Sequence, residues 1–180
     1  MLELIDTLAP VALLLIVQAG GGALGDDIAT YLRYVCIALT IVKTASWTLS
    51  SRLLSSLVGL GSAAVSVPVL YMLAVLLGAP LYATVAKDTV ELTLLGATFV
   101  ALTLTTSSLD STNILRWHDK VSTAQLRRRG VALISTLAGV WISAFAIPLD
   151  WERPWQRWPI PIVFGSALGR LIGGILNLVL

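Results

Sequence analysis

The stretch Ile160–Leu180, IPIVFGSALGRLIGGILNLVL, decides the fold class because it is long, apolar and carries a single charge, Arg170. A helix needs about 20 predominantly apolar residues to cross a hydrocarbon core about 30 Å thick. In lipid the backbone must satisfy its own hydrogen bonds, which leaves helices or closed barrels. The stretch lacks the alternation of a barrel strand. It therefore predicts a transmembrane helix.

Five further apolar runs have the same character, and they cover roughly residues 4–19, 28–49, 57–77, 88–106 and 131–147. Only 12% of the chain is charged, against about 25% in soluble domains, and the mean hydropathy is +0.88. A water-soluble protein of this size could not hide so much apolar surface in one core. We therefore expect one all-α transmembrane domain over residues 1–180, a polytopic helical bundle of about six spans.

The composition also argues against several classes of function. The formal net charge of +2 does not suggest a nucleic-acid partner. One cysteine (Cys36) and one histidine (His118) are too few for an internal disulfide or a structural zinc site. The sequence also contains no HExxH motif and no Gly-rich phosphate loop. It therefore predicts no metal, no cofactor and no catalytic residues of the chain's own.

The distribution of basic residues predicts the orientation. With six spans, seven basic residues fall on the side that holds both termini and four on the other side. Basic residues favour the cytosolic side, so both termini are predicted to be cytosolic and the loop 149–159 lumenal or external. The seven are Lys43, Arg52, Arg116, Lys120, Arg127, Arg128 and Arg129, and the four are Arg33, Lys87, Arg153 and Arg157.

The longest loop, residues 110–130, falls on the predicted cytosolic side. Its apolar residues Ile114, Trp117, Val121 and Leu126 have the spacing of a short amphipathic helix lying at the membrane surface. A plain connector held by positive charge is the alternative.

Two features within the apolar runs are candidate contact sites. Asp88 and Glu91 begin the fourth run, where they either anchor a helix N-terminus or make a polar contact with another subunit or a lipid headgroup. Gly165, Gly169 and Gly173 recur every four residues on one face of the sixth run, beside Arg170. Such a face lets a second helix approach closely, either from this chain or from a partner.

The third candidate is the segment before the last run, Ile147–Pro161, with the sequence IPLDWERPWQRWPIP. Its tryptophans suit the headgroup level of a membrane, and its prolines hold the backbone out of a helix. A stiff loop that presents Arg and Trp is suited to binding a phosphate headgroup or a partner's lumenal domain. The candidate residues are Pro148, Asp150, Trp151, Glu152, Arg153, Pro154, Trp155, Trp158 and Pro159.

The segment Pro148–Pro161 resembles the signature of the PIG-F family of glycosylphosphatidylinositol (GPI) anchor biosynthesis. Gly78-Ala79-Pro80-Leu81 and Thr98-Phe99 resemble the middle segment of the same family. The resemblance implies a multi-pass subunit of the endoplasmic reticulum membrane. Such a subunit would stabilise a large catalytic partner that transfers ethanolamine phosphate from phosphatidylethanolamine to GPI mannose. Phosphatidylethanolamine or a GPI intermediate are then candidate lipid partners.

A rival reading needs no partner. A small membrane lipid enzyme or transporter would use Asp88, Glu91, Asp150 and Glu152 directly on a phospholipid headgroup.

Overall fold

The computed structural model describes residues 2–19, 28–49, 53–76, 87–105, 123–147 and 158–179. Within these ranges the regular structure is helical, with six helices and no strand. The helices are α1 (Leu2–Ala19), α2 (Ile28–Leu49), α3 (Leu53–Leu76), α4 (Lys87–Leu104), α6 (Thr123–Ala144) and α7 (Ile160–Val179).

Each apolar run of the sequence is helical in the structure. α2 has the predicted bounds, and α1, α3, α4 and α7 differ from prediction by a few residues at their ends. α6 differs more, because it begins at Thr123 rather than at residue 131. Alanine, glutamine, leucine and arginine are strong helix formers, so the segment after Thr123 extends the apolar helix rather than forming a loop.

The predicted loop 110–130 therefore needs correction at its end. Residues 123–130 are the first turns of α6, and Leu126 belongs to that helix instead of a separate amphipathic one. Ile114, Trp117 and Val121 lie outside the described residues.

Among the described helices, two are long and apolar enough to cross a membrane by themselves, over Ile28–Ser46 and Ile160–Val179. Shorter apolar stretches cover Leu60–Leu76 and Thr89–Leu104.

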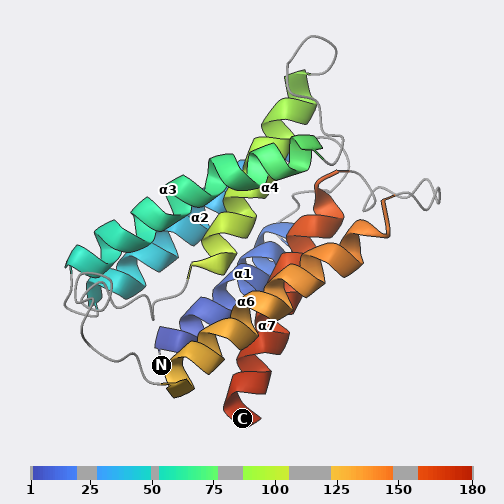
Figure 1. Ribbon diagram of the computed structural model, residues 1–180. Helices are drawn as coiled ribbons and strands as arrows, with labels where there is room; N and C mark the ends of the chain where they lie inside the picture. Colours follow the sequence, from blue (N-terminus) through green and yellow to red (C-terminus); the bar gives the residue numbers. More distant parts are fainter. Residues whose placement is uncertain are drawn as a thin grey trace.

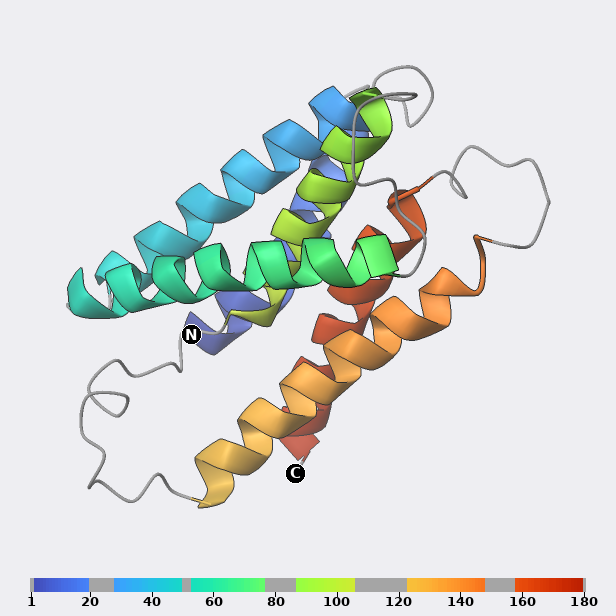
Figure 2. The same cartoon turned by 45° about the horizontal axis from the view of Figure 1, so that its top comes forward.

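α7 packs on α6, α1 and α4, while α2, α3 and α4 contact one another (Figure 1). The two views agree that α6 runs beside α7 and that α3 crosses α4 (Figure 2). Figure 1 also places both chain termini away from the start of α7. α6 is peripheral, since it packs mainly on α7 and touches α4 only slightly.

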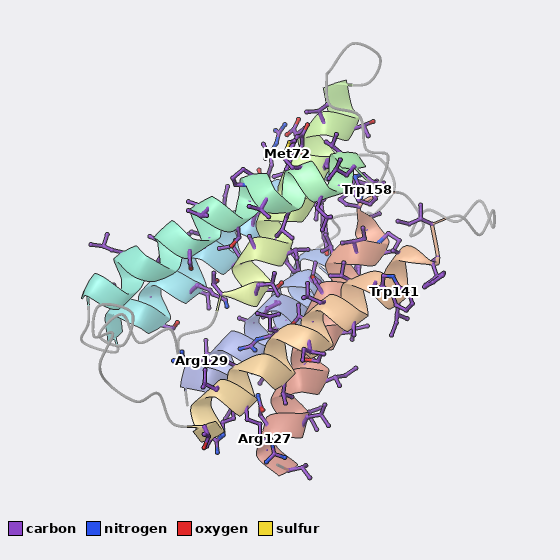
Figure 3. The ribbon with its side chains drawn as sticks, in the orientation of Figure 1. Met72, Arg127, Arg129, Trp141 and Trp158 are labelled. Atoms are coloured by element: carbon purple, nitrogen blue, oxygen red, sulfur yellow. The ribbon has the colours of Figure 1, made fainter. Side chains whose placement is uncertain are left out.

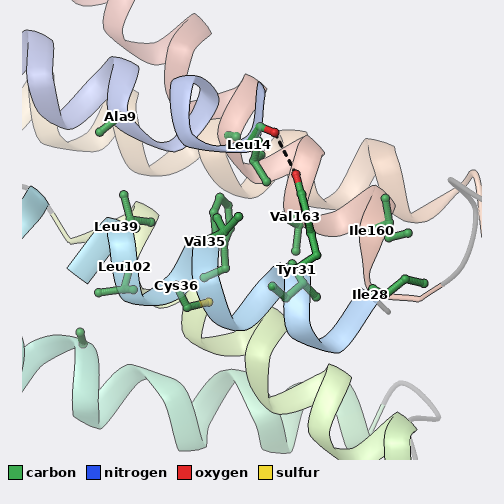
Figure 4. Close-up of a cluster of buried hydrophobic side chains, with 14 residues drawn as sticks. Ala9, Leu14, Ile28, Tyr31, Val35, Cys36, Leu39, Leu102, Ile160 and Val163 are labelled. Atoms are coloured by element: carbon green, nitrogen blue, oxygen red, sulfur yellow. Dashed lines mark hydrogen bonds between the residues drawn. The ribbon is translucent and has the colours of Figure 1, made fainter. Parts of the chain in front are cut away.

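The buried apolar cluster lies where α1, α2, α4 and α7 meet (Figure 4). α2 supplies the largest share, including Leu32, Val35 and Leu39, which are almost fully buried. A hydrogen bond of 2.9 Å from the Tyr31 hydroxyl to the Leu14 carbonyl oxygen ties α2 to α1 at the edge of this cluster. Ala63 of α3 also belongs to the cluster, which therefore joins five helices around one interior.

α6 joins the bundle through a different kind of contact, a seam of small residues against α7. A Cβ added to Gly139 would overlap the Gly165 carbonyl oxygen, and one added to Gly169 would overlap the Ser135 carbonyl oxygen. The backbones are thus in direct contact, which only glycine permits. The hydroxyl of Ser135 donates to the Val131 carbonyl oxygen of its own helix at 2.7 Å, so the seam leaves this polar group satisfied.

Gly169→Leu is expected to separate α6 from α7, because the new side chain would have to occupy space now filled by the α6 backbone. The loss of unfolding free energy should be at least about 2 kcal/mol, as in severe overpacking. Titration of the full chain with sodium dodecyl sulfate measures it. Gly61→Leu is the control, since a Cβ at exposed Gly61 meets nothing within 4 Å. Equal losses in both variants would contradict the packing described for the seam.

Candidate functional site

The start of α7 is fixed to α4 by Trp158 and Pro159, two of the candidate residues. The Trp158 indole Nε1 donates to the Thr93 hydroxyl oxygen at 2.9 Å, and that hydroxyl donates to the Thr89 carbonyl oxygen at 2.7 Å. Trp158 and Pro159 are joined by a cis peptide bond. The Pro159 ring packs on Gly96, where an added Cβ would lie 2.9 Å from the Pro159 Cβ. α4 therefore provides the socket that holds the last residues of the Trp/Pro segment.

Glu91, one turn from this socket, forms an ion pair with Arg33 of α2. The side chains are partly exposed, at 37% for Glu91 and 53% for Arg33, so the pair contributes at most about 1 kcal/mol. This contact within the chain is neither of the two sequence-based alternatives for Glu91, an anchor at the helix N-terminus or a contact with another subunit or a lipid headgroup. The ion pair and the Trp158 socket lie at the same end of α4. The structure thus brings two of the three candidate features together.

The rest of the Trp/Pro segment, including Pro148, Asp150, Trp151, Glu152, Arg153, Pro154 and Trp155, lies outside the described residues. The same holds for the side chain of Asp88, whose backbone is part of α4. The predicted roles of these residues stay predictions.

The third candidate feature, the glycine face of α7, is occupied by this chain's own helix. Gly165, Gly169 and Gly173 face Ser143, Ser135 and Ala132 of α6, with the two helices antiparallel. Internal packing is therefore the alternative that the structure supports, and a partner helix has no access to these three glycines. The sequence contains a signal for this internal packing, because Ser135, Gly139 and Ser143 repeat every four residues on α6.

Arg170 lies in the same helix and is only 6% exposed, so it points into the bundle rather than toward the surroundings. This position agrees with the requirement that a charge in an apolar helix faces protein.

Lys43 was counted among the loop charges in the sequence analysis, but the structure places it inside the bundle. Its side chain is 1% exposed, and its ammonium donates to the Thr105 carbonyl oxygen just past the end of α4. Carbonyl groups at a helix C-terminus lack intrahelical partners and carry partial negative charge. Lys43 therefore caps α4 from α2, and it no longer contributes to the count of loop charges.

The described residues include no group of three or more His, Cys, Asp or Glu side chains that could hold a metal ion. Their polar groups instead link helices, as Thr93, Glu91 and Lys43 do. The arrangement is suited to holding the Trp/Pro segment at a fixed place on a rigid bundle.

Thr93→Val is expected to loosen the start of α7, because valine keeps the shape of threonine but cannot accept the indole hydrogen bond. The loss of unfolding free energy should be about 1 kcal/mol. The backbone amide of Val163, which bonds the Pro159 carbonyl oxygen at 3.1 Å, should exchange its hydrogen faster. Thr98→Val is the matched control, since the Thr98 hydroxyl bonds the Leu94 carbonyl oxygen of its own helix. Unchanged exchange at Val163 in Thr93→Val would argue against the socket.

Comparison with known proteins gives these features a family context. A Mus musculus protein named "GPI ethanolamine phosphate transferase, stabilizing subunit" is 47% identical over 47 residues, which is 26% of this chain and 22% of that protein. An Eremothecium gossypii protein named "Glycosylphosphatidylinositol anchor biosynthesis protein 11" is 62% identical over 40 residues, which is 22% of this chain and 18% of that protein. The Candida albicans protein of the same name is 48% identical over 48 residues, 27% of this chain and 18% of that protein.

These local matches span only about a fifth of each relative's own length, 18% to 22%. No solved structure matches the chain. The profile of the GPI biosynthesis protein family Pig-F, in contrast, matches residues 3–178. Because this match covers nearly the whole sequence, the chain belongs to the Pig-F family of GPI biosynthesis proteins.

Proposed function

We propose that this chain is a non-catalytic, stabilising subunit of a GPI ethanolamine phosphate transferase. It would support the transfer of ethanolamine phosphate from phosphatidylethanolamine to GPI mannose, with the chemistry performed by a large catalytic partner. The observation that carries the proposal is the family match over residues 3–178, together with the mouse relative's name as a stabilizing subunit.

The geometry supports a binding role for the Trp/Pro segment. Thr93 and Gly96 contact Trp158 and Pro159, so the C-terminal end of the segment is attached at a fixed point on the bundle. A preorganised loop loses less conformational entropy on binding than a free one. Tryptophan and arginine, both present in residues 148–157, are the residues that most often dominate binding interfaces. The segment is therefore the proposed contact with the catalytic partner.

The proposal places the chain in the endoplasmic reticulum membrane as a multi-pass protein. Six helices would span the bilayer, with both termini cytosolic and residues 149–159 lumenal. With Lys43 buried against α4, the charge count that favours this orientation becomes six against four. The lumenal segment would then face the compartment in which the catalytic partner's domain is expected.

Cysteine labelling in sealed microsomes tests this orientation. Gln156→Cys should react with a membrane-impermeant maleimide only after the vesicles are permeabilised, because the segment faces the lumen. Ser51→Cys, between α2 and α3, should react without permeabilisation. The natural Cys36 is buried, and Cys36→Ser in both variants removes its background. Labelling of Gln156→Cys in intact vesicles would overturn the lumenal placement and the partner contact that depends on it.

Association with the catalytic partner is tested by purifying tagged full-length chain from cells in mild detergent. Trp155→Ala should reduce recovery of the ethanolamine phosphate transferase by about 30-fold, the effect of losing about 2 kcal/mol at a central interface tryptophan. Trp141→Ala is the control, because Trp141 lies on the exposed face of α6 outside the segment. Equal recovery with Trp155→Ala and wild type would contradict the proposed contact.

The same purification distinguishes the stabilising subunit from the alternative function. A lipid enzyme or transporter that acts alone would transfer ethanolamine phosphate as an isolated chain, free of any transferase. Transfer activity by the isolated chain would therefore replace the stabilising-subunit proposal.

A further inference from the structure

Neither the fold nor the proposed subunit role explains the arginines at the start of α6. Arg127 and Arg128 are exposed, and neither has an ion-pair partner among the described residues. They belong to a helix that begins at Thr123, so their position relative to the bundle is defined. The Asn177 side-chain amide donates to the Arg128 carbonyl oxygen at 3.0 Å, which holds this turn against the end of α7.

The start of this helix concentrates positive charge and would attract an anion. Helix N-termini carry partial positive charge, and acidic side chains normally occupy the first turn. α6 has no acidic residue in its first turn and has three consecutive arginines in the next. Departures from local rules of this kind tend to mark functional positions. The described part of the chain supplies no carboxylate for Arg127 or Arg128, so both guanidinium groups are open to an external anion.

The surface next to the arginines is apolar, which indicates what kind of anion would bind there. Leu126, Leu133, Ile134 and Leu137 are all exposed on α6, with Ile134 68% exposed. At the other end of this face lie Trp141 and, just past the end of α6, Phe145. Their rings form an edge-to-face pair with centroids 4.9 Å apart. Figure 3 shows Arg127 and Trp141 toward opposite ends of the helix. Arginine at one end and tryptophan at the other is the pattern of a helix that contacts both surfaces of a bilayer.

The length of α6 agrees with this placement. At about 1.5 Å per residue, the helix extends roughly 24 Å from Arg128 to its last residue, Ala144. The hydrocarbon core of a bilayer is about 30 Å thick. The guanidinium groups would therefore lie at the level of the phosphates, where planar guanidinium pairs with phosphate oxygens through two hydrogen bonds.

We propose that Arg127 and Arg128 bind the headgroup phosphates of anionic phospholipids at the membrane surface next to the chain termini. This inference rests on the membrane placement in the proposed function but does not depend on the transferase partner. An acidic segment of another protein is a less suitable occupant, because the exposed leucines and isoleucine that adjoin the arginines require an apolar environment as well.

The test uses purified full-length chain in neutral detergent, mixed with equal amounts of phosphatidylserine and phosphatidylcholine. Native mass spectrometry measures the ratio of the two lipids that stay bound. Wild type should prefer phosphatidylserine, and Arg127→Gln/Arg128→Gln should reduce this preference at least about five-fold, the effect expected of one arginine near an anionic surface. Arg127→Lys/Arg128→Lys keeps the charge and should keep most of the preference.

The control is Lys87→Gln, which removes a positive charge from the start of α4. It should leave the lipid ratio unchanged. The preference of wild type should also fall as salt is raised, since exposed charges are screened, and this measurement requires no variant. A salt-independent ratio, an unchanged ratio in the double Gln variant, or an equal loss in the control would each overturn the lipid site. Recovery of the transferase, measured in parallel, reports separately on the proposed function.

Discussion

The bundle depends on how closely other helices can approach α7. Gly165 and Gly169 admit the backbone of α6, and Gly174 lies against the Thr7 side chain of α1. At the start of the helix the relation is reversed, because Pro159 packs into the space left by Gly96 of α4. In the proposed membrane placement, helix association is driven by close packing and not by the hydrophobic effect, so contacts of this kind would carry much of the stability. The small residues of α7 thus face two neighbours, α6 and α1, and a small residue of α4 admits Pro159.

This packing also determines where the Trp/Pro segment ends. α7 cannot slide along α6 without moving glycines away from the backbone that they contact, and the Trp158–Thr93 hydrogen bond fixes its start on α4. The exit point of residues 148–157 is therefore set by contacts that lie outside the segment.

Periodicity and hydrophobicity were enough to predict the six helices and the bounds of α2, because each run is long and the breaks at Gly20–Gly22 and Gly78–Pro80 are strong. They missed the true start of α6, since the arginines reduce hydropathy without reducing helix propensity. The glycine face of α7 was visible in the sequence, but its occupant depends on which helices are neighbours. Which helices are neighbours is decided by the tertiary structure, and so is the ion pair between Glu91 of α4 and Arg33 of α2.

The capping of α4 by Lys43 has a consequence for how the protein is made. A lone ammonium group in the middle of a hydrocarbon layer costs about 2.5–3.5 kcal/mol on insertion scales. In the proposed membrane placement, α2 emerges from the ribosome well before α4, whose end supplies the Thr105 carbonyl oxygen for Lys43. In that placement α2 would carry its ammonium group without this carbonyl oxygen until α4 arrives, so the insertion of the two helices into the bilayer would be coupled.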